Sequence, residues 1–224
     1  MKWWRTLAFI FVLLLFVAFS VWRVLWSPYQ VEALYAAVPA HAIFVSEHAR
    51  LAERWPVWSQ HPLVRSIVTG LGVEARDAER VARAPGTQAL LNRLAPLNTV
   101  VAYVPSLGRR GEPAWVLATW VGMQGQLMRW GFYNKLLANF EQRTFSGGRQ
   151  GWVQEHLPGS RSDQKLSLAV VQGVLIACVS AEPEAVALLM RRVEDRAAYP
   201  EMLRAPWGWE GDVIRYPDRV YAGD

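Results

Sequence analysis

Residues 7–26 read LAFIFVLLLFVAFSVWRVLW, and this stretch decides how the rest of the chain is organised. The sixteen residues from Leu7 to Trp22 carry no charge, and most of them are Leu, Phe, Val or Ile. Twenty residues in a helix span about 30 Å, which is the thickness of the hydrocarbon core of a bilayer. The stretch therefore predicts a single membrane-spanning helix.

Aromatic and basic residues flank this run at both ends. The candidate membrane-interface residues are Trp3, Trp4, Trp22, Arg23 and Trp26. Tryptophan is enriched where a membrane meets water, and a long arginine side chain near a helix end can reach the headgroups. These flanks are what an uncleaved anchor needs at its two interfaces.

The basic residues around the run also predict its orientation. Lys2, Arg5 and the amino terminus precede the apolar residues, whereas Arg23 alone follows directly. An excess of positive charge marks the cytoplasmic side of a membrane helix. We therefore expect a cytoplasmic amino terminus and an extracytoplasmic carboxyl-terminal domain.

Two other interpretations of the run remain open, a cleaved signal peptide and a buried helix of a soluble protein. This apolar run is longer than the apolar region of a usual signal peptide. The small-residue motif at residues 40–42 (AHA) also lies well beyond the run and opens a predicted strand. Both observations favour the anchor.

The composition limits the classes of function. The chain has 24 basic and 19 acidic residues; without the three basic residues of the predicted anchor, 21 basic residues stand against 19 acidic ones. The pairs Arg109-Arg110 and Arg191-Arg192 are predicted to lie on a solvated loop and a solvated helix face. A nucleic-acid-binding face needs clustered basic residues, so no nucleic-acid partner is expected.

The single cysteine, Cys178, excludes an internal disulfide. It lies in an apolar strand pattern, VLIACVS, where a free cysteine behaves as a small buried hydrophobe. The domain must therefore be stabilised by its core, even in an oxidising compartment.

Composition and turn residues divide the chain into four parts. The predicted parts are a membrane anchor (1–26), a tether (27–38), an extracytoplasmic α+β domain (39–195), and an extended tail or the start of an incomplete further domain (196–224).

Within the domain, short β-branched and aromatic runs alternate with helical patterns. Strands are predicted at 41–46, 99–104, 114–121, 144–146, 150–156, 165–171 and 174–179. Helices are predicted within 49–70 as two short pieces, at 88–94, at 124–140, and from a cap at Ser180 to Asp195. Tight turns between strands predict a mostly antiparallel sheet packed with a few helices. Segments 98–141 and 150–195 each have the order strand, strand, helix, which suggests a ββα repeat.

The sequence contains no recognisable catalytic, cofactor-binding or metal-binding motif. Its glycine-rich pieces, 70–72 and 147–151, do not match a phosphate-binding pattern, and no HExxH, C-x-x-C or G-x-S-x-G motif occurs. Two Glu-His pairs at predicted strand ends are the residues on which a hydrolase would depend: Glu47-His48 and Glu155-His156. Solvated strand ends are the simpler explanation of both pairs.

Two tryptophans near the carboxyl end, Trp207 and Trp209, lie outside any periodic pattern. Tryptophans elsewhere in the domain fit the core, since they bury large apolar areas. An exposed pair here would contact a partner protein, lipid headgroups or a glycan.

Several segments together resemble a large class of uncharacterised bacterial membrane-anchored proteins of unknown function. The resemblance lies in the signal-anchor, the strand entry VPAHAIFVSE, the segment WPVWSQHPLVRSIV, and the strands LSLAVVQGVLIACVS before a Ser-capped helix. It covers most of residues 1–195 and implies a single-pass protein of the bacterial inner membrane, with no catalytic residues to transfer. Members are often longer, continuing from a segment like YPDRVYAGD, so a short variant and a fragment both remain open.

The sequence supports three functional hypotheses. The first is an extracytoplasmic binding or scaffolding domain in the cell envelope, with the lipid bilayer and an unidentified envelope protein as partners and no cofactor. The second is a membrane-tethered envelope hydrolase. The third is a glycan- or lipid-binding module.

Overall fold

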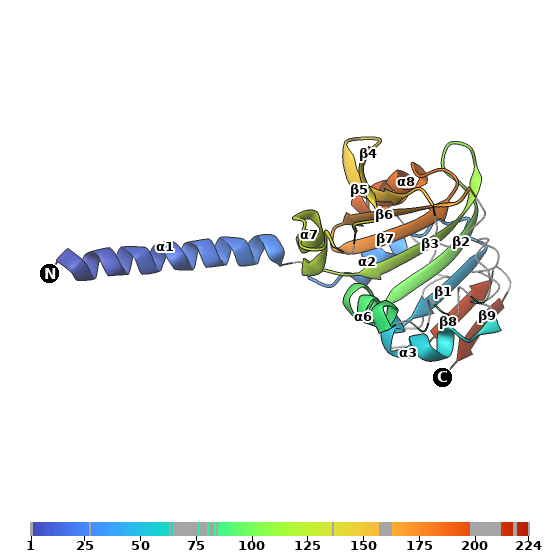
Figure 1. Ribbon diagram of the computed structural model, residues 1–224, viewed down its shortest axis with the longest axis horizontal. Helices are drawn as coiled ribbons and strands as arrows, with labels where there is room; N and C mark the ends of the chain where they lie inside the picture. Colours follow the sequence, from blue (N-terminus) through green and yellow to red (C-terminus); the bar gives the residue numbers. More distant parts are fainter. Residues whose placement is uncertain are drawn as a thin grey trace.

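The structure, a computed structural model, describes residues 2–26, 28–62, 64, 76, 80, 83, 85–135, 137–156, 163–197, 212–216 and 219–223. Figure 1 shows an α+β domain built on one curved sheet, with a long helix, α1 (Lys2–Leu25), extending away from it. Side chains are described for most of these residues, but not for the strands at 212–223.

The sheet has nine strands in the order β4-β5-β6-β7-β3-β2-β1-β8-β9, and all neighbours are antiparallel. The strands are β1 (Phe44–His48), β2 (Thr99–Leu107), β3 (Glu112–Trp120), β4 (Glu141–Phe145), β5 (Arg149–Gln154), β6 (Lys165–Val171), β7 (Val174–Ser180), β8 (Asp212–Tyr216) and β9 (Arg219–Gly223). The prediction of an α+β fold with an antiparallel sheet is confirmed. Tight turns set the hairpins, such as β6–β7, where Gln172 and Gly173 have positive φ.

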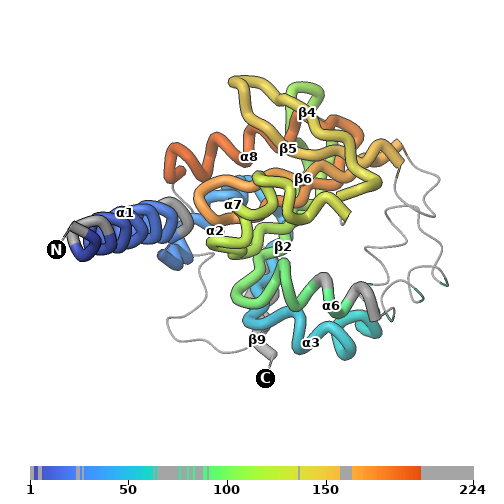
Figure 2. Tube along the Cα trace, turned by 60° about the vertical axis from the view of Figure 1, so that its left-hand side comes forward, coloured from blue at the N-terminus to red at the C-terminus, as the bar shows by residue number. Residues whose placement is uncertain are grey.

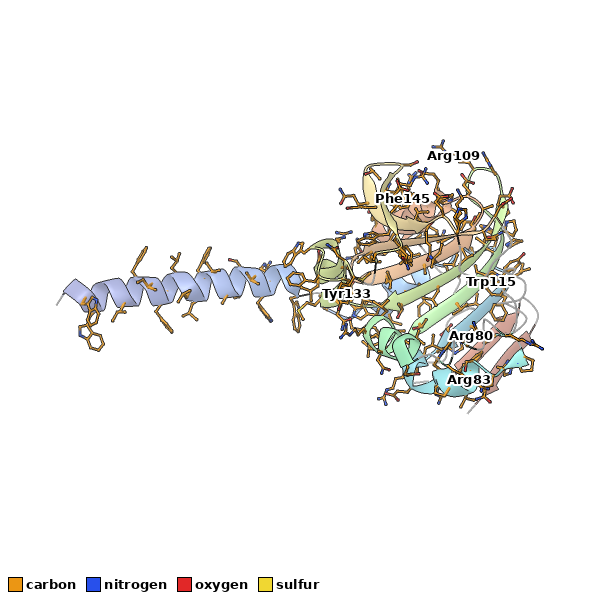
Figure 3. All side chains as sticks on the ribbon, in the orientation of Figure 1. Arg80, Arg83, Arg109, Trp115, Tyr133 and Phe145 are labelled. Atoms are coloured by element: carbon orange, nitrogen blue, oxygen red, sulfur yellow. The ribbon has the colours of Figure 1, made fainter. Side chains whose placement is uncertain are left out.

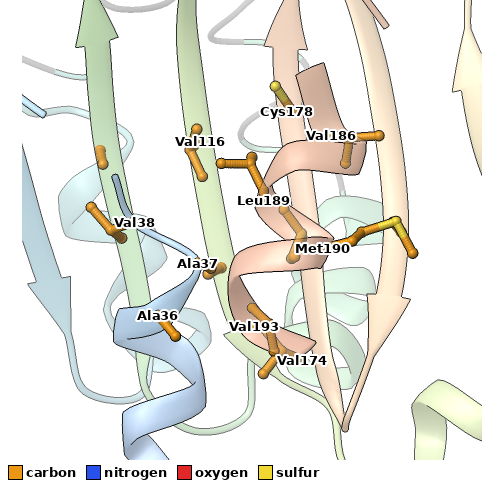
Figure 4. Close-up of a cluster of buried hydrophobic side chains, with 14 of the residues drawn as sticks. Ala36, Ala37, Val38, Val116, Val174, Cys178, Val186, Leu189, Met190 and Val193 are labelled. Carbon is orange, nitrogen blue, oxygen red and sulfur yellow. The ribbon is translucent and has the colours of Figure 1, made fainter. Parts of the chain in front are cut away.

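One face of the sheet carries the main core. Alternate strand residues, including Val116, Val174 and Cys178, are buried beneath α2 (Val31–Ala36) and α8 (Ala185–Glu194) (Figure 4). Arg192 joins the two helices: its Nε and Nη2 donate to the carbonyl oxygens of Ala36 (3.1 Å) and Val38 (3.0 Å). Burial lowers the pKa of Arg192. Ser180 lies before α8 as predicted and its Oγ accepts from the Glu182 amide (3.1 Å), but the regular helix begins only at Ala185.

The opposite face carries α7 (Met123–Arg129), which packs near one end of β6 and β7. Met128 and Leu137 join Val170 and Leu175 in a second apolar cluster. A Cβ at Gly125 would lie 2.6 Å from Val170 Cγ1, so a side chain here would push the helix off the sheet. Because α8 covers the other face, the order strand, strand, helix recurs while its two helices pack on opposite sides.

The helix predicted for residues 124–140 ends much earlier than its apolar spacing suggests. Gly131 has φ of 80°, its amide donates to Met128 O, and the Phe132 amide donates to Leu127 O, both at 3.1 Å. This pair of bonds is the Schellman motif, in which a left-handed glycine ends a helix. The prediction was wrong because the apolar spacing of Leu127, Trp130 and Leu137 continues past Gly131, where the helix ends.

Two short helices lie beside β1 at the other end of the sheet. They are α3 (Leu51–Trp58) and α6 (Pro85–Leu94), which contact each other, and the side-chain Nε2 of Gln88 donates to Ala52 O. The predicted helical region 49–70 therefore begins with α3, and most of its residues after Pro62 lie outside the described residues.

The pattern at 196–224 predicts an extended tail or the start of a further domain, but the described parts of that stretch extend the same sheet. Strand β8 pairs with β1, and β9 pairs with β8. The strand sequences DVIRY and RVYAG are rich in β-branched and aromatic residues, and only two residues separate them. The proline content at 200–217 had suggested an irregular segment instead.

The long helix α1 stands apart from the sheet in both views (Figures 1 and 2). Its thirteen large apolar side chains between Leu7 and Trp22 are 46% to 70% exposed, and they point in every direction around the helix. Among the described residues, no helix combines the length with the mean hydropathy that together identify a membrane-spanning segment.

Candidate functional site

A cavity of about 290 Å³ opens between three elements that are far apart in the sequence. These elements are the β2–β3 turn, the β4–β5 turn and the start of α8. We call this cavity the distal groove; it is lined by Gly108, Arg109, Ser146, Gly147, Arg149, Glu182, Glu184, Ala187, Leu188 and Arg191. Its lining combines apolar surface with the side chains of three arginines and two glutamates.

Two carboxylates organise the walls of the distal groove. The Arg110 amide donates to Glu182 Oε2 (3.1 Å), so Glu182 holds the β2–β3 turn. The amide and hydroxyl of Ser146 donate to Glu184 Oε2 (3.2 and 2.9 Å), so Glu184 holds the β4–β5 turn. Both carboxylates therefore bind backbone amides of turns, and these two turns meet at the start of α8.

The three arginines of the distal groove differ in how many hydrogen bonds and ion pairs they form. Arg149 donates from Nε (2.9 Å) and Nη2 (2.5 Å) to Glu194 Oε2, and from Nη1 to Ser146 O (3.1 Å). Arg191 faces Asp195 at 3.3 Å, an exposed pair one helical turn apart, which contributes only about 0.3–0.5 kcal/mol. Among the described residues, Arg109 forms no ion pair. The available positive charge of the distal groove is thus on Arg109 and Arg191.

The distal groove and α1 lie at opposite ends of the domain. Strand β3 begins at the β2–β3 turn and ends at Trp120, whose ring contacts Tyr29 in the tether edge-on at 5.4 Å. Nine residues of strand separate these ends by roughly 27 Å. Figure 3 places Arg109 at the tip of its turn, away from α1.

The Glu-His pair of β1 splits between the two faces of the sheet, because neighbouring strand residues point in opposite directions. Glu47 is buried on the core side, where Tyr35 Oη donates to its Oε2 at 2.9 Å. His48 is on the other side, with Nε2 2.5 Å from Ser46 Oγ and its ring edge-on to Trp58 at 4.2 Å. The two side chains cannot share one site.

The second Glu-His pair lies far from the first. Glu155 and His156 follow β5, and four strands stand between β5 and β1 in the sheet. Glu155 forms ion pairs with Lys165 and with Arg143 (3.5 Å). Its hydrogen bond to Lys165 is the main cause of a lowered pKa. The four residues proposed for a hydrolase are therefore not brought together.

The Ser46–His48 contact is a pair that sequence reasoning missed. A serine beside a histidine can form a nucleophile and its base, but the pair must reach a substrate. Ser46 is 1% exposed and His48 is 3% exposed. The pair is therefore a buried polar contact between two residues on the same side of β1.

Cys178 is also unsuited to nucleophilic chemistry. Its thiol is fully buried in β7, and burial raises its pKa to about 12. A thiol that stays protonated at neutral pH is a poor nucleophile. Within the described residues, no group of three or more His, Cys, Asp or Glu side chains could hold a metal ion.

The predicted membrane-interface residues all lie on or directly after α1, and their described side chains are exposed: Trp3, Trp4, Trp22, Arg23 and Trp26. The rings of Trp22 and Trp26 contact each other at 5.1 Å. Trp207 and Trp209 lie outside the described residues, so their predicted role in partner contact stays a prediction.

Sequence reasoning assigned the residues of the distal groove to ordinary surface positions. The sequence predicts Arg109 on a solvated loop and Arg191 on a solvated helix face. The two residues are 82 positions apart in the chain, so no local pattern indicates that they line one cavity. No protein-family model, no curated protein and no solved structure matches this chain.

Proposed function

We propose that this chain is a single-pass protein of the bacterial inner membrane whose extracytoplasmic α+β domain binds a partner in the cell envelope. The observation that carries the proposal is the arrangement of two surfaces. An apolar helix leaves one end of the domain, and a charged cavity opens at the other end. A tethered binding domain needs both.

The anchor is supported by the exposure of α1. A helix that is apolar on every side is stable only inside a protein core or inside a bilayer. No described element covers the thirteen large apolar side chains between Leu7 and Trp22. With 24 residues, α1 is about 36 Å long, enough to cross a hydrocarbon core. The proposal rests on this exposure and on the flanking tryptophans.

The orientation rests on the charges that flank the anchor, with Lys2 and Arg5 before it and Arg23 after it. A carboxyl-terminal reporter that is active only outside the cytoplasm should be active when fused to the full chain, and a cytoplasm-specific reporter should be inactive. Replacing Lys2 and Arg5 by Glu serves as the matched control and should reduce the outside signal. Activity of the cytoplasmic reporter alone would refute the orientation, and loss of the first residues from the mature chain would favour a cleaved signal peptide.

Binding through the distal groove is supported by a difference between its acidic and basic side chains. Glu182 and Glu184 accept hydrogen bonds from turn amides. Arg109 forms no ion pair among the described residues, and Arg191 has only its exposed pair with Asp195. Guanidinium groups pair best with carboxylates or phosphates, often through two parallel hydrogen bonds. We therefore expect the partner to offer an anionic group to this cavity.

A photo-crosslinking residue at Arg191 or Leu188 should capture a repeatable partner in native membranes. The matched control is the same residue at Val57, which is exposed on α3 at the other end of the sheet. Replacing both Arg109 and Arg191 by Glu should reduce the crosslink at Leu188 at least tenfold, since like charges would then face the anionic group. Equal capture at Leu188 and Val57, or no effect of the charge reversal, would argue against the distal groove as the binding surface.

The hydrolase hypothesis is weaker, because its four residues lie on different faces and different ends of the sheet. The glycan or lipid hypothesis depends on Trp207 and Trp209. Replacing both by Ala would test it.

A further inference from the structure

A second apolar surface lies on the domain itself, on α7 and the turn after it. Met123, Trp130 and Phe132 are all exposed, and Phe132 is 73% exposed, although they belong to one ten-residue segment. Met128 and Leu137 of the same region are buried against the sheet. The segment therefore presents one apolar side to the core and another to its surroundings, as a surface does when it contacts a partner.

The backbone holds this outer side in place. The Schellman bonds at Gly131 fix the backbone on both sides of the turn, so Trp130 and Phe132 are held on either side of the helix end. Arg129 Nη2 donates to Val170 O, which ties the last turn of α7 to β6. Because the backbone of this turn is already fixed, contact with a partner does not require the backbone to be ordered.

This surface lies at the end of the domain from which α1 departs. Trp120, which contacts Tyr29 of the tether, lies directly before α7, and the Gly122 amide donates to Gly173 O (2.9 Å) to hold that junction. Figures 1 and 2 both show α7 beside the domain end of α1. The exposed side chains of Trp26 and Tyr29 continue the apolar surface toward the helix.

The charge of the segment also fits an interface with lipid. Residues 121–140 contain no Asp or Glu, and their basic residues Arg129 and Lys135 are exposed. Aromatic side chains beside basic ones are typical of surfaces that lie in the headgroup region of anionic membranes. By contrast, the distal groove at the other end holds glutamates and no aromatic side chain.

We infer that Met123, Trp130 and Phe132, with Lys135, form a membrane-contacting patch that dips into the headgroup layer of the bilayer holding α1. This inference rests on the proposed anchor and adds a second point of contact. Two contacts on one end fix how the domain is oriented on the membrane. They direct the distal groove away from the lipid.

The test uses the full-length chain reconstituted in vesicles of zwitterionic and anionic phospholipid. Single cysteines carry an environment-sensitive fluorophore at Phe132→Cys in the patch, Leu14→Cys in α1, and Leu188→Cys and Val57→Cys as exposed apolar controls. Cys178 is fully buried and does not compete for the label. Lipids with quenchers near the headgroup and at the chain centre report the depth of each fluorophore.

We expect quenching from the headgroup region at Phe132 to exceed that at Leu188 and Val57 several-fold. Replacing Trp130 and Phe132 by Ser should lower the quenching of a fluorophore at Met123→Cys to the level of Leu188. These side chains are exposed, so the substitutions should leave the melting temperature of the domain nearly unchanged.

The outcomes separate the patch from the anchor. Quenching at Leu14 with none at Phe132 overturns the patch and leaves the anchor standing. Quenching at Phe132 with none at Leu14 supports a membrane-contacting patch and overturns the spanning anchor. Quenching at neither position overturns both, and equal quenching at Phe132, Leu188 and Val57 overturns the patch as a specific surface.

Discussion

Replacing both Leu13 and Phe16 by Arg is expected to release the protein from the membrane fraction. Both side chains lie in the middle of α1 and are at least half exposed, so neither supports the core of the domain. An arginine at the centre of a membrane helix costs about 3 kcal/mol relative to an apolar residue, so two cost about 6 kcal/mol. Such a cost lowers the equilibrium for insertion by a factor of more than about 10⁴.

Extraction of membranes at alkaline pH measures this effect directly. Wild-type protein should remain with the lipid, and the double variant should appear in the soluble fraction. The matched control replaces Leu188 and Val57, which are apolar and exposed on the domain, by Arg. This control should remain with the lipid, because neither position belongs to the anchor. Extraction of the wild-type protein, or retention of the double variant, would contradict the proposed anchor.

Replacing Leu189 by Ala is expected to destabilise the domain strongly. Leu189 is 0% exposed on α8, in the cluster that joins α8 to α2 and to the central strands (Figure 4). A Leu-to-Ala change in a packed core costs about 2–5 kcal/mol, from lost burial and from the cavity that remains. With roughly 2–4 °C for each kcal/mol in a domain of this size, the melting temperature should fall by about 4–20 °C.

The neighbouring residue provides the control for this substitution. Leu188 has the same side chain and lies on the same helix, but it is 43% exposed at the edge of the distal groove. Leu188→Ala should change stability by no more than about 0.5 kcal/mol. Near-ultraviolet circular dichroism of the detergent-solubilised full chain would monitor both transitions. Similar melting temperatures for the two variants would show that α8 does not carry the core.

The two ends of the domain have different chemistry. Tyr29 and Trp120 join the tether to the end of β3, where exposed aromatic side chains gather. The other end of β3 leads to the distal groove, where glutamates hold turns and arginines face solvent. A single strand therefore connects the proposed membrane side to the proposed binding side.

Local signals were sufficient for most of the sheet. The hairpin of β6 and β7 is encoded by two apolar runs around Gln172-Gly173, and that of β2 and β3 by runs around a turn-rich linker. At two places the structure depends on contacts or stop signals that the local apolar spacing does not show. Gly131 ended α7 although the apolar spacing continued, and β8 joined β1 across more than 160 residues of chain.

The sequence by itself determined the apolar helix, the antiparallel hairpins and the burial of Cys178, because each depends on residues that are neighbours in the chain. Only the tertiary structure decided which polar residues meet. It placed Glu47 and His48 on opposite faces, separated them from Glu155 and His156, and placed Arg109 and Arg191 in the lining of one cavity. The physical reason is that strand order and the packing of helices on each face depend on long-range contacts, which the local spacing of residues does not encode.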